Sequence, residues 1–402
     1  MTDFTRPGLR PSRRSFMVGA AGAGTAFSFP APAVLAATTA PIKLGVLNTF
    51  TGPLSYAGLS SLAGMQVYFD RIGWKSAGRK IEIIKEDDQF NPQLGLEKAK
   101  KFVERDKVAM IVGPTASNVA MALLNYVQQV KAFLVVSGAG VDAVTSTLHP
   151  YIFRTSISTW QLSAPMAEWI YDNLAKQLVL TAADYAGGHD VLNEFKKPFI
   201  AKGGKILKEM YPPLGTTDYS PYLTDLKSLN PQATYNFYPG SDALRFMQQY
   251  VQYGLKAHVP LTGFELIDSM SLAAAGKSAL GVITAVPYTP ALDNPQNKRF
   301  LPEFIAKTKN TPDHFGDYGF VAAQAIDETL KAVDGDTSNK DKLSAAMVKV
   351  AFNAPRGPFR FDPKSHNPIQ NIYICKVEEI GGKFLNKDFS TIKEVRDPGN
   401  TQ

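Results

Sequence analysis

Short apolar runs alternate with longer stretches of helical periodicity between residue 42 and about residue 158. The apolar runs predict four strands, at residues 42–47, 81–85, 108–112 and 133–136. In the stretches between them, apolar residues recur three and four positions apart, which predicts one-sided helices. Asn91 and Pro92 begin one of these helices, as an N-cap residue and a first-turn proline. Such an alternation predicts a parallel sheet with right-handed crossovers.

A second alternation of the same kind begins after residues 156–159 and runs to about residue 286. It predicts five strands, at residues 178–182, 205–210, 233–238, 259–263 and 282–286. After Pro287 the pattern changes to three helices and two late strands, at residues 298–308, 318–333, 340–350, 356–362 and 371–377. Because the second unit is complete by then, we expect the added helices to cover the first. The predicted fold class is α/β, with two parallel sheets and helices on both faces.

Polar loops follow the third and fourth predicted strands, so both lie at the carboxyl ends of buried strands. In an open α/β sheet, ligands bind at this edge. The first loop contains Ser117, and the second is Ser137, Gly138, Ala139 and Gly140. We expect the Ser117 hydroxyl and the backbone of the second loop to hold a small anion. We also expect the protein to bind this ligand without reacting with it.

The second loop continues into Val141, Asp142 and Ala143 and so matches the G-x-G-x-x-A pattern of dinucleotide sites. A dinucleotide site would place this pattern in the first strand–helix unit, with an acidic residue about 20 residues further on. Here the pattern follows the fourth strand, and Thr159 and Trp160 stand near that distance. We therefore interpret the glycines as a tight turn or a place where the backbone approaches a small ligand.

Aromatic residues gather at or just beyond the ends of predicted elements. They are Trp160, Tyr185, Tyr235, Phe237 and Tyr238. An aromatic ring in the middle of a strand belongs to the core, whereas one at a strand's carboxyl end often lines a cleft. Among the five, we expect Trp160 and Tyr238 above all to contact the ligand.

The composition is that of a globular protein of 402 residues, 45% hydrophobic and 20% charged. The net charge is +7, of which the first 37 residues contribute +3, and the remainder is spread along the chain. This weak and scattered charge argues against nucleic-acid binding. The single cysteine, Cys375, lies in a strand-like run and is interpreted as a buried structural thiol.

The N-terminus has the pattern of an export signal. Residues 12–17, SRRSFM, resemble the twin-arginine signal, and an apolar stretch of 13 residues follows at 17–29. That stretch is shorter than the ~18 residues that suggest a spanning helix. Small residues before Ala36 predict a cleavage site, and no cysteine stands there to carry a lipid. We expect residues 1–36 to be removed and the protein to reside in the periplasm.

Signals of catalysis are scarce. Five histidines are present, none at metal-ligand spacing, and each is interpreted as a surface or turn residue: His149, His189, His258, His314 and His366. Asp87 and Asp88 form a carboxylate pair, which we interpret as part of a strand-end turn. Neither GxSxG, a P-loop nor HExxH occurs in the sequence. We therefore expect no catalytic residue, metal or cofactor.

Eight segments carry a resemblance to one family. They are IKLGVLNTFTGPLSYAG at 42–58, IKEDDQFNPQLGLEKAKKFV at 84–103, MIVGPTAS at 110–117, FLVVSGAG at 133–140, YIFRTS at 151–156, DYAGG at 184–188, TDYSPYLTDLKSLNPQATYNFYPGSDA at 217–243 and GPFRFD at 357–362. In order and spacing they resemble the substrate-binding proteins of ABC importers for branched-chain and other hydrophobic amino acids, which have the type I periplasmic fold.

This resemblance implies two Rossmann-like lobes joined by a three-stranded hinge, with the ligand in the cleft between the lobes. On this basis the first lobe would comprise residues 42–158 and 287–358. The second lobe would comprise residues 159–286 and 359–395.

The resemblance also implies roles for individual residues. The Ser117 hydroxyl and backbone N–H groups near Ser117, Ala139, Gly140 and Val141 would hold a ligand carboxylate. Val141 stands where the family has a threonine, so one hydroxyl is missing. Glu265 would meet the ligand's amine or a hydroxyl group.

Aromatic residues would enclose the rest of the ligand. Trp160, Tyr185 and Tyr238 would cover its apolar body. Thr159, Trp160 and Gln161 replace an acidic stretch of the family. This change favours an aromatic acid, whereas Glu265 favours an amine, and the sequence leaves both ligands open.

The sequence thus predicts a monomeric periplasmic receptor that delivers a small organic carboxylate to an inner-membrane ABC permease. Two alternatives stay open at this point. One is a ligand-sensing receptor for a membrane signalling protein, and the other is an exported α/β enzyme.

Overall fold

The computed structural model describes residues 40–52, 54–267 and 269–399. The export signal predicted at residues 1–36 lies outside this part of the chain. Within the described residues, no helix combines the length and the apolar character needed to cross a membrane.

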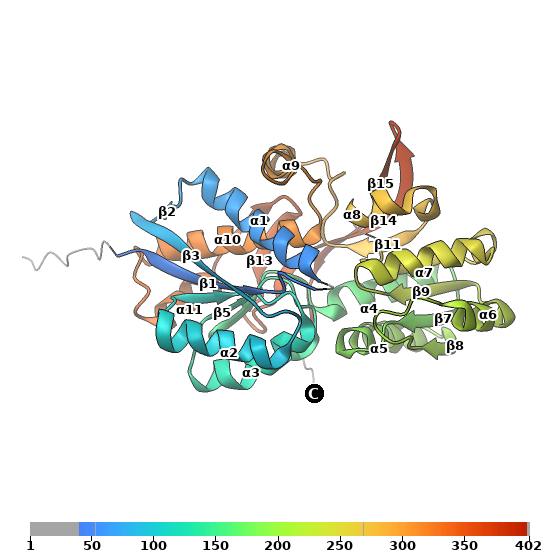
Figure 1. The fold of residues 1–402 in the computed structure, drawn as a ribbon, viewed down its shortest axis with the longest axis horizontal. Helices are drawn as coiled ribbons and strands as arrows, with labels where there is room; N and C mark the ends of the chain where they lie inside the picture. The colour runs from blue at the N-terminus through green and yellow to red at the C-terminus, as the bar shows by residue number, and fades with distance from the viewer. Residues whose placement is uncertain (1–39, 53, 268, 400–402) are drawn as a thin grey trace, which may run out of the picture. The chain divides into compact units, whose positions relative to one another are not determined.

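The first sheet has six strands in the order β2-β3-β1-β4-β5-β6 (Figure 1). Their bounds are β1 (Ile42–Asn48), β2 (Lys75–Ser76), β3 (Arg79–Asp87), β4 (Met110–Val112), β5 (Leu134–Val136) and β6 (Ile152–Arg154). All neighbours pair in parallel except β2, which pairs antiparallel with β3. The carboxyl ends of β1, β3, β4, β5 and β6 therefore lie at one common edge, where the polar loops follow.

Helices cover both faces of this sheet because its strands bury side chains on both sides. The helices are α1 (Ser55–Arg71), α2 (Pro92–Lys101), α3 (Ser117–Gln129), α9 (Pro295–Thr308), α10 (His314–Ala332) and α11 (Lys340–Met347), with a π-helical turn, η1 (Phe102–Asp106), after α2. Leu44 and Val46 of β1 pack into the core formed with α1 and α10, whereas Leu47 faces the core of α2 and α3. The helices after Pro287 thus cover the first sheet, as the sequence pattern led us to expect.

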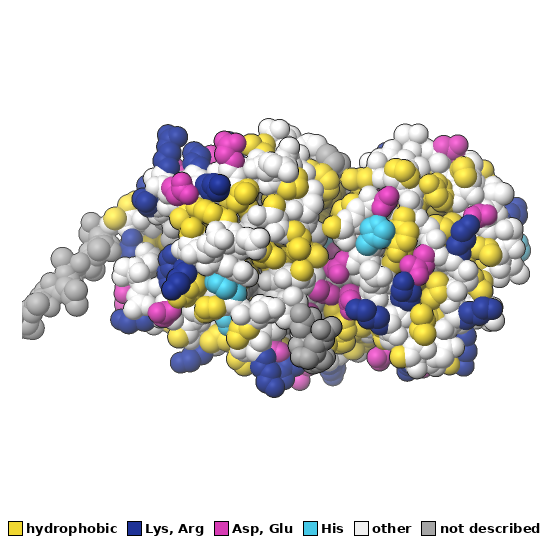
Figure 2. Space-filling view, turned by 90° about the horizontal axis from the view of Figure 1, so that it is seen from below, with side chains coloured by type: hydrophobic (Ala, Val, Ile, Leu, Met, Phe, Trp, Pro, Cys, Tyr) yellow, Lys and Arg dark blue, Asp and Glu magenta, His cyan; other side chains and the backbone are white. Residues whose placement is uncertain are grey.

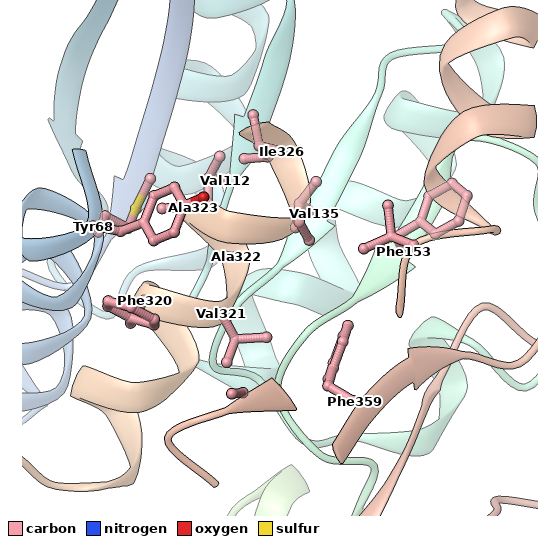
Figure 3. Close-up of a cluster of buried hydrophobic side chains, with 14 of the residues drawn as sticks. Tyr68, Val112, Val135, Phe153, Phe320, Val321, Ala322, Ala323, Ile326 and Phe359 are labelled. Atoms are coloured by element: carbon pink, nitrogen blue, oxygen red, sulfur yellow. The ribbon is translucent and has the colours of Figure 1, made fainter. Parts of the chain in front are cut away.

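The core between the first sheet and α10 is shown in Figure 3. Val112 and Val135 come from β4 and β5, and Phe320 and Ile326 come from α10. Phe359 of β13 joins the same cluster. The late part of the chain is therefore packed into the core built by the first.

The second sheet has nine strands in the order β12-β13-β14-β11-β10-β9-β7-β8, with β15 paired to β14. Their bounds are β7 (Gln177–Ala182), β8 (Lys205–Met210), β9 (Ala233–Phe237), β10 (Leu261–Phe264), β11 (Ile283–Val286), β12 (Ala351–Ala354), β13 (Gly357–Phe361), β14 (Pro368–Ile380) and β15 (Lys383–Val395). The strands from β7 to β11 pair in parallel, and those from β12 to β15 pair antiparallel. The prediction of two mainly parallel sheets is confirmed.

The helices of the second sheet also lie on both faces. They are α4 (Thr159–Asn173), α5 (Ala186–Ala201), α6 (Ser220–Leu229), α7 (Ser241–Gln252) and α8 (Ser269–Ala275), with 3-10 turns η2 (Asp142–Val144), η3 (Leu255–Ala257) and η4 (Gly276–Ala279) elsewhere in the chain. Leu178 and Leu180 of β7 pack toward α4 and α5, whereas Val179 packs toward α6 and α7. This alternation follows from the two-residue period of a strand.

A buried polar network joins segments of the two sheets. The fully buried Arg356 pairs with Asp317 of α10 and donates to the Thr155 carbonyl after β6, at 2.9 Å, and to Gln370 Oε1 of β14, at 2.7 Å. β12 and β13 belong to the second sheet by hydrogen bonding, although Phe359 packs in the core of the first. The lobe boundaries at residues 158, 286 and 358 therefore stay a prediction.

The structure contains strands that the sequence pattern did not predict, among them β2, β12 and β15. Cys375 is buried in β14, and burial raises the pKa of its thiol, which fits the structural role expected of it. Figure 2 shows Lys and Arg side chains dispersed among acidic and hydrophobic ones on the face that it presents. That face offers no continuous basic patch for a nucleic acid.

Candidate functional site

A cavity lies where loops from the carboxyl ends of the two sheets meet. Its lining comes from the loops after β4, β5, β9 and β10 and from the first turns of α1, α5 and α10. The lining residues are Leu54, Tyr56, Thr115, Ser117, Gly138, Gly140, Ile157, Thr159, Tyr185, Gly187, Val191, Phe237, Tyr238, Pro239, Gly240, Ala243, Phe264, Glu265, Ser271, His314 and Phe315. The cavity is thus at the sheet edge where the sequence placed the ligand.

Polar residues of the first sheet's loops contribute to the lining. Ser117 is the first residue of α3, and Thr115 precedes it in the loop after β4. The N-cap residue Ala116 makes no side-chain cap, the first turn contains no acidic residue, and Asn118 Oδ1 accepts the Val119 N–H at 2.9 Å. The N–H groups that begin the helix and the positive end of its dipole favour an anion at this place.

The loop after β1 is held by the acidic pair at the end of β3. Asp87 accepts hydrogen bonds from the Phe50 N–H, at 2.8 Å, and from Thr51. Asp88 accepts one from Thr49 Oγ1, at 2.6 Å. These bonds position the chain as it enters α1, so the pair serves a strand-end turn, as its sequence predicted.

The fully buried Arg154 shapes the loop after β5. Its guanidinium donates to the carbonyls of Ala139, Val141 and Ile157. Two backbone oxygens of this loop, and that of Ile157 after β6, thus point at one buried cation. The strong charge-assisted bonds fix the loop's conformation in the absence of regular structure.

Aromatic rings form the walls of the cavity. The contributing residues are Tyr56, Tyr185, Phe237, Tyr238, Phe264 and Phe315. Phe237 packs edge-on against Phe264 with ring centroids 5.1 Å apart, and Tyr56 does the same against Phe315 at 5.8 Å. The hydroxyl of Tyr238 is bonded to Thr181, so only its ring is offered to the cavity.

Glu265, which follows β10 of the second sheet with a positive φ of 42°, also lines the cavity. The Tyr318 hydroxyl of α10 donates to Glu265 Oε1 at 2.7 Å. His314 Nε2 lies 3.4 Å from Glu265 Oε2. Burial, together with the nearby Arg356, lowers the pKa of His314 to about 3, so this imidazole is neutral at physiological pH.

Glu265 is the only acidic or basic side chain in the lining formed by the described residues, apart from the neutral His314. An anion bound near Ser117 would therefore be held by hydroxyl and N–H donors. The lining offers hydroxyl and N–H donors, aromatic rings and one carboxylate, which suits a flat ligand that carries both a carboxylate and a hydrogen-bond donor.

Five of the residues expected at the site line this cavity: Ser117, Gly140, Tyr185, Tyr238 and Glu265. Contact of these residues with a ligand stays a prediction.

The other three expected residues, Ala139, Val141 and Trp160, are not in the lining. The Ala139 N–H is donated to the Pro114 carbonyl at 2.9 Å, and Val141 packs in the core beside α3. Trp160 donates its N–H to Asp142 and packs toward the second core. In this structure the contacts just named link these three residues to other parts of the protein.

Sequence reasoning missed Thr115, Tyr56, His314 and Phe315. His314 was interpreted as a surface or turn residue, whereas its side chain is 6% exposed in the first turn of α10. The N-cap Asp313, which accepts the Gly316 N–H at 2.8 Å, was the available signal that a helix begins there. Nothing in the sequence indicated that this helix start would face the first polar loops.

Three carboxylates lie together outside the cavity lining. Ligand atoms of Asp142, Asp190 and Glu194 are all within 4.8 Å of one another. Burial, and then the charge of Asp190, raises the pKa of Asp142 well above its ordinary value. Acidic groups cluster in this way in many proteins without an ion, so the cluster does not change the expectation of a site without metal.

The architecture and the cavity can be set beside known proteins. Residues 41–383 match the model of a family described as periplasmic binding protein. The chain belongs to this family. The match runs from just before β1 to the first residue of β15 and so includes every loop of the cavity.

Individual relatives of this periplasmic binding protein agree over nearly the whole chain. The Leu/Ile/Val-binding protein homolog 6 of Brucella melitensis is 31% identical over 386 residues, which are 93% of this chain and 97% of the relative. An ABC transporter substrate-binding protein from Sphaerobacter thermophilus is 34% identical with a TM-score of 0.85, over 89% of this chain and 99% of its own.

A third relative has a structure with a ligand. It is a solute binding protein of an ABC transporter from Rhodopseudomonas palustris BisB5 in complex with 3,4-dihydroxybenzoic acid. It is 33% identical with a TM-score of 0.85, over 90% of this chain and 99% of its own. The two solved relatives are binding proteins of ABC transporters and not enzymes, which confirms the prediction of a binding protein without catalysis.

Proposed function

We propose that this periplasmic binding protein is the ligand receptor of an ABC importer and that its ligand is a small aromatic carboxylate with a hydroxyl group opposite the carboxylate. The observation that carries the proposal is the set of groups that line the cavity. The lining combines uncharged donors of Thr115, Ser117 and the α3 N-terminus with six aromatic rings and one carboxylate, that of Glu265.

Each part of the cavity has a matching part in such a ligand. The carboxylate would accept hydrogen bonds from the Ser117 hydroxyl and the N-terminus of α3. Charge-assisted bonds of this kind contribute about 1.5–3 kcal/mol each. The ring would pack against Tyr56, Phe237 and Phe315, since aromatic pairs favour edge and offset contacts. A phenolic hydroxyl would donate to Glu265.

The ligand of the solved relative supports this assignment. 3,4-Dihydroxybenzoic acid has a carboxylate at one end of a ring and hydroxyl groups at the other, and it is bound by a protein 33% identical to this chain. The cavity lining contains complementary groups: donors for a carboxylate, aromatic rings for the ring, and the Glu265 carboxylate as an acceptor for a hydroxyl group.

An aliphatic amino acid is a second candidate because Glu265 could pair with an ammonium group. The name of the Brucella melitensis relative points the same way. Against it, six aromatic side chains line the cavity and outnumber the aliphatic ones, which are Leu54, Ile157, Val191, Pro239 and Ala243.

The receptor would work in the periplasm as a monomer. The twin-arginine signal at residues 1–36 would export the folded chain. The lobes would close on the ligand by a hinge motion and present it to an inner-membrane permease.

A thermal-shift panel tests this proposal. The purified protein is heated with benzoate, 4-hydroxybenzoate, 3,4-dihydroxybenzoate, leucine or valine. A ligand at 100 times its Kd should stabilise the fold by about 2.7 kcal/mol. We expect the two hydroxybenzoates to raise Tm most, benzoate less, and the amino acids least. A larger shift with leucine would favour the amino acid, and no shift with any carboxylate would contradict the proposal.

A further inference from the structure

Near Ser117, the cavity lining offers only uncharged donors to a bound anion. Neither lysine nor arginine occurs in the lining formed by the described residues. A carboxylate bound near Ser117 therefore has no cation to pair with, and every hydroxyl or N–H group that reaches it carries a larger share of its binding. The number of such donors decides how well an anion is held there.

Two donors expected from the family resemblance are not available in this structure. The Ala139 N–H is already donated to the Pro114 carbonyl. Val141 has no hydroxyl, and its side chain packs in the core beside α3. Ser117 would be left as the only expected hydroxyl, so a compensating donor is to be looked for in the same loops.

Thr115 has the properties of that donor. Thr115 is 6% exposed, lines the cavity and stands two positions before Ser117 in the chain. Its Oγ1 is buried and has no hydrogen-bond partner among the described residues. Among the buried side-chain atoms of the described residues that lack a partner, it is the only one in the cavity lining.

The packing around Thr115 restricts its side chain. A Cβ on Gly138 would lie 2.6 Å from Thr115 Cα and 2.8 Å from its Cγ2, so the methyl group is packed tightly against the loop after β5. A branched side chain with its methyl fixed in this way has few rotamers left. The hydroxyl is thus held in place before any ligand binds, and a buried hydroxyl without a partner is unusual in a folded protein.

We propose that Thr115 Oγ1 donates a hydrogen bond to the ligand's carboxylate and so replaces the hydroxyl that Val141 cannot supply. This inference rests on the proposed function, because it needs a carboxylate near Ser117. The Thr115 and Ser117 hydroxyls and the α3 N-terminus then form one anion-binding group.

Thr115→Val tests the inference, because valine keeps the shape and methyl group and removes only the hydroxyl. Binding of 4-hydroxybenzoate is measured by titration calorimetry. We expect Thr115→Val to weaken binding about tenfold or more, the loss of a charge-assisted bond. Thr115→Ser, which restores the hydroxyl, should lie within about threefold of the wild type.

Ser61→Ala is the matched control. Ser61 Oγ is also buried without a partner among the described residues, but it lies on α1 outside the cavity lining. Its removal should leave the affinity unchanged. The Tm of ligand-free Thr115→Val should equal or exceed that of the wild type, because no bond within the protein is lost, and this excludes misfolding as the cause of weaker binding.

The outcomes separate this inference from the proposed function. If the wild type binds 4-hydroxybenzoate and Thr115→Val binds it equally well, Thr115 is not a donor and the receptor assignment stands. A wild type that binds no hydroxybenzoate at all overturns the assignment of a hydroxylated aromatic ligand and the inference with it.

Discussion

We expect Glu265 to determine which ligand groups can bind beside it in the cavity. Its side chain is 9% exposed, and it receives the Tyr318 hydroxyl while lying beside the neutral His314. A buried carboxylate is costly unless its oxygens are hydrogen-bonded. On the proposed function, a ligand that adds a donor there would be favoured over one that presents an apolar atom, so we expect Glu265 to discriminate between ligands.

Glu265→Gln should reduce this discrimination. The amide keeps the size of the side chain but is a weaker acceptor, so we expect 4-hydroxybenzoate to bind about five- to twentyfold more weakly. Benzoate has no donor for this position and should bind as well as before or slightly better, since one negative charge near it is removed. Titration of both acids against both proteins measures the difference. An equal loss for the two acids would contradict the assigned role.

His314 lies beside Glu265 as a neutral side chain. Burial lowers its pKa to about 3, with the charge of Arg356 acting in the same direction. The imidazole therefore adds no charge beside Glu265 in the physiological range. The residue that the sequence placed on the surface thus lies in the cavity lining.

At the scale of elements, the cavity exists because α1 and α10 approach each other closely. A Cβ on Gly64 would lie 1.8 Å from the Gly316 carbonyl oxygen, and one on Gly319 would lie 1.9 Å from that of Ser61. Only glycine allows backbones to come so near. The two helix starts, which carry Tyr56 and Phe315, are thereby brought to the same wall of the cavity.

The contact between η2 and α5 contains a pair of carboxylates. The Asp142 N–H donates to Asp190 Oδ2 at 3.1 Å, and Asp142 Oδ1 accepts the Trp160 N–H at 3.2 Å. Burial first, and the neighbouring charge second, raises the pKa of Asp142. Arg154 opposes the shift, and Asp397 adds to it.

This shift predicts a pH dependence of stability. Because the pKa of Asp142 is higher in the folded than in the unfolded chain, the folded state holds a proton that the unfolded state releases, and stability falls as pH rises through that window. Asp142→Asn removes this loss and still accepts the Trp160 N–H. We expect its Tm to exceed that of the wild type by about 2 °C or more at pH 7 and to equal it at pH 4.

Melting curves of both proteins at the two pH values measure this difference. An equal gap at both pH values would show that proton binding is not its cause. A lower Tm of Asp142→Asn at pH 7 would contradict the sign of the effect.

At the scale of the whole molecule, Arg356 links the segments that connect the two sheets. Its buried ion pair with Asp317 and its bonds to Thr155 and Gln370 join α10, the end of β6 and β14. The Tyr318 ring lies 4.7 Å from the guanidinium, and the Tyr318 hydroxyl reaches Glu265. A continuous line of contacts thus runs from the connections between the sheets to Glu265 in the cavity lining.

The periodicity of the sequence was sufficient to predict most strands and helices of this molecule. Runs such as residues 108–112 and 133–136 are buried on both faces, and their apolar character is visible without neighbours. β15 was missed because nearly all of its side chains are exposed or half-buried and of mixed polarity, with Gly381 and Gly382 as the one local signal of a hairpin turn.

The site was harder to predict than the fold. Ser117 could be expected in the cavity lining because loops after parallel strands share one edge, whereas Glu265 was expected there from the family resemblance. Thr115 could not be chosen over its neighbours, because its lack of a partner is a property of packing. The hydrogen bonds from the buried Arg154 to the Ala139 and Val141 carbonyls are likewise not visible in the sequence.

A crystal structure of the protein with 4-hydroxybenzoate tests the central claim most directly. The account predicts the ligand in the cavity with its carboxylate within hydrogen-bond distance of Ser117 Oγ and Thr115 Oγ1. Its ring should lie among the aromatic walls, and its hydroxyl should donate to Glu265. A ligand bound in the reverse orientation, or outside this cavity, would contradict the account.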